Sequence, residues 1–176
     1  VTVMKRNAIR YLLALFLVLS SALVIAAGNG PEKAHNPNPR PIMGTLNGEV
    51  TFPLNDACKN VTGAWWQTTT VAVGEMDHFG LTEHYSTHCS TLDGMSLVSG
   101  EASFVAANGD ELWTTYTGQV LAGPPVIMIL AEYIVTGGTG RFEGASGTIM
   151  AMVYVTLVGM EVPNPIEMNF AGTIAY

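Results

Sequence analysis

From residue 44 to the C-terminus the chain shows no helical periodicity and instead repeats one pattern eight times. Each repeat is a short run rich in Val, Ile, Thr and aromatic residues, and Gly, Asn, Asp or Pro separates it from the next. Such runs are typical of β-strands, because branched and aromatic side chains pack well on a pleated surface. The predicted strands are 44–52, 65–74, 81–90, 97–107, 111–121, 126–136, 148–158 and 166–176.

The connections between these runs are too short to hold crossover helices. Asn108-Gly109 predicts a tight hairpin, because both residues tolerate the positive φ that such a turn needs. The segments 122–125 and 159–165 contain Gly and Pro and predict further turns. Eight strands joined in this way form an antiparallel meander, and closure removes its unpaired edges. We therefore predict an all-β fold, an eight-stranded antiparallel up-and-down β-barrel.

The residues before the first strand have the three regions of a secretory signal peptide. A basic head is followed by an apolar run over 11–25 and by small residues suited to cleavage near Ala27. The alternative is an uncleaved N-terminal anchor. We predict a signal peptide over 1–27, a flexible leader rich in Pro and Asn over 28–43, and a single barrel domain over 44–176. The mature protein is expected to be secreted or periplasmic.

Removal of the signal peptide changes the net charge of the chain. It leaves four basic residues against all 14 acidic ones, a net charge of −10. A chain this acidic repels nucleic acids and anionic membranes. We therefore predict no nucleic-acid partner.

Cys58 and Cys89 are the two cysteines, and both lie in the part predicted to be exported. An oxidising compartment permits a disulfide between them, and the sequence leaves open whether it forms. Neither cysteine has the neighbours of a zinc knuckle or of a CxxC redox pair.

The alternation of side chains differs between the last three predicted strands. Strand 166–176 alternates apolar and polar residues, whereas 126–131 and 149–153 are apolar on both faces. A second apolar face on a soluble barrel needs a cover, so we predict a homo-oligomer, a trimer or a dimer. An outer-membrane barrel is the alternative. The Thr- and Ser-rich early strands lack a wide apolar band, so we predict no stable membrane insertion.

The segment TGGTGRFEGASGT, residues 136–148, holds five glycines. It lacks the Lys-Ser/Thr ending and the following helix of a phosphate-binding loop. We predict a structural corner in which glycines adopt positive φ and Phe142 plugs the end of the barrel. The corner glycines are Gly137, Gly138, Gly140, Gly144 and Gly147.

This corner resembles the GGTGxFxGAxG segment of the allene oxide cyclase and dirigent-like β-barrels. ASFVAANGDELWTTYTG and GEMDHFG are similar to segments of exported bacterial proteins with the same corner. The resemblance covers 44–176 and implies an eight-stranded barrel, often a trimer. In enzymatic members it implies an apolar cavity that steers a cyclisation or a coupling. The chain departs from the THLG pattern of these proteins at Asp77 and Phe79.

Glu132 is the one acidic residue of the most apolar strand, where it shares a face with Met128 and Leu130. A carboxylate in an apolar row needs a partner, a raised pKa or a wet cavity. We therefore predict Glu132 as the acid or base if the protein is catalytic, and an ion pair with Arg141 is the alternative. Glu83 is a weaker candidate.

His84 and His88 share a strand face with Thr82, Ser86 and Ser90, which we predict to be exposed to solvent. Positions i and i+4 of a strand lie about 13 Å apart, too far to hold one ion. We predict no metal and no cofactor.

Three functions are compatible with the sequence. The first is a barrel that binds a hydrophobic small molecule without catalysis. The second is a cyclase or isomerase that uses an apolar cavity plus one acid or base, and the third is a structural barrel filled by its own side chains. The predicted binding residues are Glu83, Tyr85, Tyr116, Met128, Met152 and Tyr154.

Overall fold

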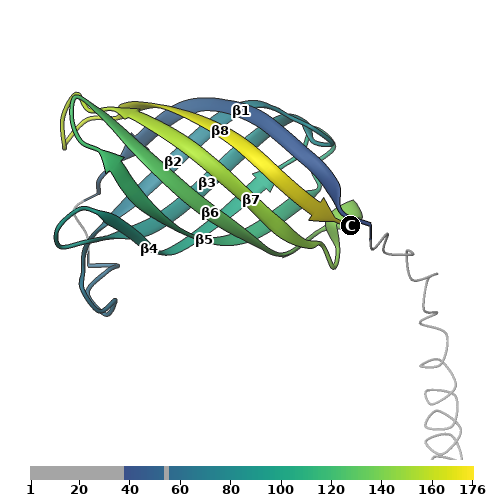
Figure 1. Cartoon of the computed structure of the whole chain (residues 1–176), viewed down its shortest axis with the longest axis horizontal. Coiled ribbons are helices and arrows are strands. Elements are labelled where there is room, and N and C mark those ends of the chain that lie inside the picture. The colour runs from purple at the N-terminus through teal and green to yellow at the C-terminus, as the bar shows by residue number, and fades with distance from the viewer. Residues whose placement is uncertain (1–37, 54–55) are drawn as a thin grey trace, which may run out of the picture. The chain divides into compact units, whose positions relative to one another are not determined.

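The computed structural model describes residues 38–53 and 56–176, which form a closed eight-stranded barrel (Figure 1). The strands are β1 (Arg40–Thr51), β2 (Ala64–Met76), β3 (Gly80–Thr91), β4 (Ser96–Val105), β5 (Glu111–Ala122), β6 (Val126–Gly138), β7 (Ser146–Thr156) and β8 (Asn164–Ala175). The predicted signal peptide and most of the predicted leader lie outside the described residues. No helix among the described residues is long and apolar enough to span a membrane.

Every strand pairs antiparallel with the next one in the sequence, and β1 closes the barrel by pairing with β8. The predicted up-and-down barrel is therefore confirmed. Its first strand begins at Arg40, so the predicted boundary at residue 44 was wrong. Residues 40–43 pair with β8, from Arg40 opposite Ile174 to Met43 opposite Ala171, and they belong to the sheet.

One end of the barrel is filled by aromatic side chains. Phe142 belongs to a short 3-10 helix, η1 (Gly140–Phe142), and is fully buried. Its ring stacks on Phe79 at 4.5 Å and lies 5.0 Å from the ring of Tyr176. Phe104 packs behind Phe79 with an edge-to-face contact. We call this the closed end of the barrel.

The glycine-rich corner surrounds η1. Gly140 has φ 56° and Gly144 has φ 72°, a region of backbone conformation that favours glycine. Gly138 is needed for another reason, because a Cβ there would clash with the Glu111 carbonyl and with Phe142. The corner therefore brings the chain tightly around Phe142 and leaves no loop shaped for a phosphate.

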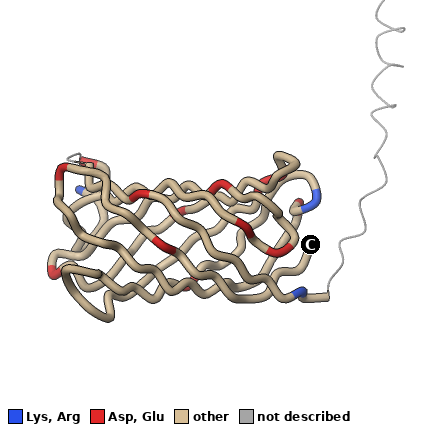
Figure 2. The backbone as a smooth tube through the Cα atoms, turned by 90° about the horizontal axis from the view of Figure 1, so that it is seen from above, with Lys and Arg blue, Asp and Glu red and all other residues tan. Residues whose placement is uncertain are grey.

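The charged residues are unevenly placed on the barrel. The basic residues of the described part are Arg40, Lys59 and Arg141, and Figure 2 shows them at the ends of the barrel. Lys59 pairs with Asp56, and Arg141 with Asp110 at 3.6 Å. Acidic residues are also spread along the wall (Figure 2).

The outer face of β6 and β7 is apolar, as the sequence indicates. Leu130, Ile134 and Met150 are each more than a third exposed, and Met128 and Met152 are half-buried beside them. The register places Met128 opposite Tyr154 and Leu130 opposite Met152. The strands thus carry an apolar stripe on the outside in addition to the core inside.

Candidate functional site

The other half of the barrel is hollow. A cavity of about 130 Å³ lies between the core and the loops at the end opposite η1. Val50, Ile127, Ile129, Val153, Val155 and Ile166 form its apolar wall. Phe52, Trp66, Gly94, Leu157 and Met160 lie around its mouth. A water molecule needs roughly 10–15 Å³ of such space, so the cavity has room for on the order of ten waters.

The opposite wall of the cavity is polar, and β2, β3 and β5 build it. The polar residues that line it are Thr68, Thr70, Ser86, His88, Ser90 and Tyr116. All six are less than a tenth exposed. Our prediction that the face of β3 carrying His84 and His88 is exposed to solvent was therefore wrong. A barrel interior accepts polar side chains where they bond to one another, and polarity alone does not identify the outer face.

His88 and Tyr116 meet in this wall. Nδ1 of His88 and the phenol oxygen of Tyr116 lie 2.8 Å apart and share a hydrogen bond. Burial lowers the pKa of His88 to about 4. Burial also raises the pKa of Tyr116, and a contact with the Ser86 side chain opposes that rise. Both groups are therefore neutral near pH 7, and none of the residues in 38–53 and 56–176 that line the cavity is charged.

His84 lies deeper, between the cavity and the closed end. It is fully buried, and its Nε2 lies 3.1 Å from the Ser86 hydroxyl. Its ring packs against Phe104 at 4.6 Å. Desolvation by burial lowers the pKa of His84 to about 3. The interior of β3 is thus a strip of neutral hydrogen-bonding groups that faces an aromatic core.

Two polar atoms at the cavity have no hydrogen-bond partner among the described residues. They are Nε1 of Trp66 and Oγ1 of Thr68, and both residues line the cavity. A buried polar group without a partner costs about 1–3 kcal/mol, so such groups in a native fold call for an explanation. A ligand with a hydroxyl or carbonyl group would supply the missing partner.

The mouth of the cavity carries exposed apolar side chains on the surrounding loops and strand ends. They are Trp65, Leu92, Met95, Leu121, Val158, Met160 and Val162, each more than 40% exposed. Loop tips are usually polar. A ring of apolar side chains at the loop tips around an opening therefore favours binding of an apolar ligand or of another apolar surface at this end.

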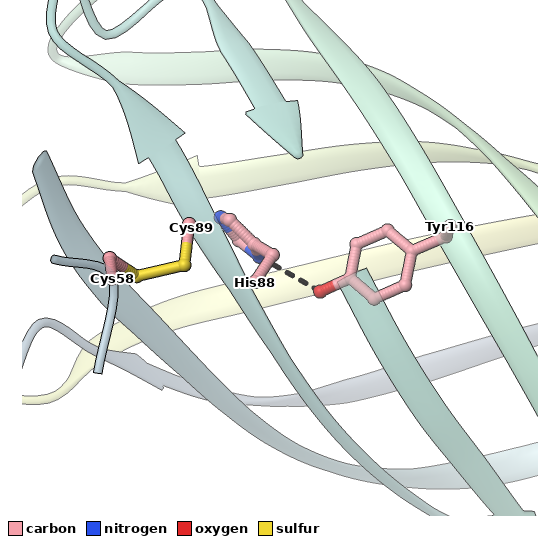
Figure 3. Close-up of a disulfide and its surroundings, with 4 residues drawn as sticks. All are labelled: Cys58, His88, Cys89 and Tyr116. Atoms are coloured by element: carbon pink, nitrogen blue, oxygen red, sulfur yellow. Dashed lines mark hydrogen bonds between the residues drawn. A yellow bond between two sulfur atoms is a disulfide. The ribbon is translucent and has the colours of Figure 1, made fainter. Parts of the chain in front are cut away.

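A disulfide joins the loop between β1 and β2 to the wall of the barrel. Cys58 and Cys89 are bonded, with their Cα atoms 5.7 Å apart. Figure 3 shows Cys89 beside His88 on β3, with His88 directed toward Tyr116. Because neighbouring side chains of a strand point to opposite faces, a bond from Cys89 to an outer loop places His88 inside.

The structure separates the predicted binding residues. Of the six, Tyr116 alone lines the cavity. Met128, Met152 and Tyr154 lie on the outer face of β6 and β7, and Glu83 and Tyr85 lie on the outer face of β3, where they bond to each other at 2.8 Å. These five assignments were wrong, since in each strand the opposite set of side chains faces inward.

The catalytic role suggested for Glu132 required its carboxylate to face the interior. Glu132 is exposed, and its neighbours Ala131 and Tyr133 are the buried ones. Arg141 pairs with Asp110 instead of Glu132. Glu132 is therefore placed outside the cavity, and the catalytic assignment does not stand.

Sequence reasoning missed His88, Ser90, Thr68 and Trp66. One signal was available for the histidine. If Cys89 bonds to a cysteine in an outer loop, Cys89 points outward, and the alternate positions that include His88 point inward. No comparable signal identifies Trp66, because the pairing of β2 with β3 shifts register between Ala64 and Trp66.

No group of three or more His, Cys, Asp or Glu side chains in residues 38–53 and 56–176 is arranged to hold a metal ion. The described residues that line the cavity offer neutral hydrogen-bonding groups beside an apolar wall.

Comparison with known proteins identifies the fold. No protein-family model matches the chain, and no curated protein matches it. The solved structure of the pterocarpan synthase dirigent protein GePTS1 is similar at a TM-score of 0.51 and 14% identity, over 87% of this chain and 99% of that one. The solved structure of PsPTS1, also a pterocarpan synthase dirigent protein, is similar at a TM-score of 0.50 and 13% identity, over 80% of this chain and 97% of that one. The chain therefore has a dirigent-like eight-stranded barrel fold.

Proposed function

We propose that the protein binds a small, uncharged, largely apolar molecule inside its barrel and performs no chemistry on it. The observation that carries this proposal is the two-sided cavity. One wall is aliphatic, and the other offers hydroxyl, phenol, indole and imidazole groups. Ligand sites commonly combine an apolar lining with a few placed polar groups that fix orientation.

The polar wall limits the chemistry of the ligand. Trp66 can only donate a hydrogen bond, whereas the Thr68 hydroxyl can donate or accept. A ligand hydroxyl or carbonyl could engage both unpartnered atoms. A charged ligand would lose its hydration without meeting an opposite charge, which is unfavourable. The occupant is thus an uncharged molecule with a hydroxyl or carbonyl group that is small enough for a cavity of about 130 Å³.

A second candidate function is proton transfer by His88 and Tyr116, as in an isomerase or cyclase. The hydrogen-bonded pair lies in the cavity wall, and its two groups are an acid and a base of the kind such reactions use. The similar structures are named as synthases, which adds weight to this candidate. Recovery of the bound molecule unchanged after long incubation would exclude it for that molecule.

The third function considered from the sequence, a barrel filled by its own side chains, is disfavoured by the cavity. Export stays part of the proposal and is supported by the predicted signal peptide and by the Cys58–Cys89 disulfide. N-terminal sequencing of the protein secreted by its host would test it, with cleavage near Ala27 expected.

Assembly through the apolar outer face of β6 and β7 also belongs to the proposal. This face exposes Leu130, Ile134 and Met150 around the exposed Glu132, which pairs with Met150, and burial of such a largely apolar face is a usual reason for a homo-oligomer.

Paired ligands test the binding function. We expect 2-naphthol to bind more tightly than naphthalene by about tenfold, because one additional hydrogen bond in a dry cavity is worth about 1–1.5 kcal/mol. Equilibrium dialysis measures both Kd values. The anion 2-naphthoate is the control and should bind weakest. Equal affinities for 2-naphthol and naphthalene would refute a role for the polar wall, and no binding of either would refute the proposed function.

A further inference from the structure

A second concave surface lies on the outside of the barrel, over β2 to β6. It is a groove of about 460 Å³. Its outward-facing polar residues are Thr69, Thr87, Glu101, Ser103, Thr115 and Thr136. Ser86, Ala102 and Thr114 are buried between this groove and the barrel interior. The groove and the cavity are therefore separate sites.

Two aromatic side chains lie at one side of this groove. Tyr85 on β3 is 44% exposed and Trp113 on β5 is 42% exposed. The register places both opposite Ser103 of the intervening strand β4. The two residues are therefore separated by two strand spacings, roughly 10 Å. Gly137 pairs with Trp113 on the other side, so small residues flank the indole and leave it uncovered.

Both aromatic residues are held in place by a carboxylate on their own strand. The Tyr85 hydroxyl donates a hydrogen bond to Glu83 at 2.8 Å, and the Trp113 Nε1 donates one to Glu111 at 2.9 Å. These bonds restrain two large side chains on the surface. Binding surfaces made of restrained aromatic side chains lose little conformational entropy when a ligand arrives.

The polar groups of the groove indicate the ligand. Four threonines and a serine offer hydroxyls that both donate and accept, while the Glu101 carboxylate can only accept. Within the described residues, no hydrogen bond or ion pair engages Glu101. The surface is therefore suited to a ligand rich in hydroxyl donors. Three nearby carboxylates, Glu83, Glu101 and Glu111, exclude an anion.

We propose that this outer groove binds a neutral glycan. A pyranose ring has an apolar face of C–H groups and a rim of hydroxyls, which matches exposed aromatic rings above a floor of hydroxyl and carboxylate groups. Tyr85 and Trp113 would each contact a sugar ring, and Glu101 would accept hydrogen bonds from adjacent hydroxyls. Because the two aromatic residues lie on different strands of an extended floor, the site suits a linear chain of several sugars.

The outer face of β6 and β7 differs in kind from this groove. That face is built mainly of Met, Leu and Ile side chains with Glu132 among them, whereas the groove has a polar floor with two aromatic residues at its side. The groove borders that face, since Thr136 lies on β6 and Thr115 pairs with Ile134. The proposed site does not depend on the ligand of the internal cavity.

Isothermal titration calorimetry with the linear neutral glycans cellohexaose and xylohexaose tests the proposal. We expect at least one to bind, and Trp113→Ala and Tyr85→Ala each to weaken its Kd at least tenfold. Glu101→Gln should weaken binding less, and Tyr85→Phe should retain most of it because the ring remains. Trp65→Ala is the matched control, since Trp65 is 67% exposed but lies outside the groove, and it should leave the Kd unchanged.

Thermal unfolding first checks that each variant folds, and Tyr85→Ala replaces Trp113→Ala if the latter does not. Binding of 2-naphthol should persist in both variants, which separates this proposal from the function of the cavity. The absence of binding by both glycans would overturn the proposal, as would equal loss of binding in Trp65→Ala. Tighter binding of choline than of either glycan would also overturn it, by identifying an aromatic cation site.

Discussion

The two buried histidines make the stability of the barrel depend on pH. In the unfolded chain both imidazoles gain a proton near pH 6.5, whereas in the barrel burial lowers the pKa of His88 to about 4 and that of His84 to about 3. Between pH 6.5 and 4 the unfolded state therefore binds more protons than the folded state. The free energy of unfolding must fall as the pH is lowered through this range.

The magnitude follows from the two shifts. Each histidine that protonates only on unfolding changes the free energy of unfolding by about 1.4 kcal/mol per pH unit. Because the unfolded imidazole is half protonated at pH 6.5, we expect from pH 6.5 to pH 5 a loss of about 1.6 kcal/mol for each of His84 and His88, and about 3 kcal/mol for both. This range lies above the usual pKa of carboxylates, so they contribute little.

Urea unfolding followed by circular dichroism, at half-unit steps from pH 7 to pH 5, measures the loss by linear extrapolation. His84→Gln and His88→Gln should each halve the slope of stability against pH, whatever they do to the absolute stability. A free energy of unfolding that stays constant from pH 7 to pH 5 would refute the conclusion that His84 and His88 are neutral in the folded barrel.

Four further outcomes are expected. Thr68→Val should stabilise the free protein by about 1 kcal/mol in urea unfolding, because it removes an unpartnered hydroxyl; a destabilised variant would mean that the hydroxyl is satisfied. Gly140→Val should cost about 1–3 kcal/mol, because φ is 56° and a Cβ would clash with the Asp110 carboxylate; an unchanged melting temperature would contradict this. Light scattering should find an oligomer that Leu130→Glu dissociates, and a wild-type monomer would show that the β6–β7 face needs no cover. Cys58→Ser should lower stability by about 3–4 kcal/mol, as expected for a bond that closes a loop of 31 residues; a loss below about 1 kcal/mol would contradict it.

The strands and turns could be predicted from the sequence because their signals are local. Alternation of side chains and the Gly, Asn and Pro between runs identified all eight strands, with boundaries displaced by a few residues. A hairpin does form at Asn108-Gly109, but Gly109 alone has a positive φ, 85°, so the expectation that both turn residues use positive φ was wrong for Asn108. Closure followed from the need to remove unpaired edges.

The orientation of the faces could not be predicted in the same way, since alternation defines two sets of side chains without saying which is inside. On β3 the polar set is inside, where His84 bonds to Ser86 and His88 to Tyr116. On β6 both sets are largely apolar, so the sequence left open which set faces inward, and the catalytic role of Glu132 depended on that choice.

The cavity depends on the combined volume of the inward-facing side chains of all eight strands, which no single segment of the sequence reveals. At the closed end Phe79, Phe104 and Phe142 fill the barrel, whereas around the cavity the inward positions of β2 and β3 hold Thr and Ser. The inward-facing side chains therefore become too small to fill the barrel toward its mouth. Only the register of all eight strands shows which large residues share a layer.

A crystal structure of the protein with 2-naphthol tests the central claim, ligand binding in a half-polar cavity, most directly. We predict the fused rings against Ile127, Ile129 and Val153, and the ligand oxygen within hydrogen-bonding distance of Thr68 Oγ1 or Trp66 Nε1. A cavity occupied by the protein's own side chains, or 2-naphthol bound only outside the barrel, would contradict the proposed function.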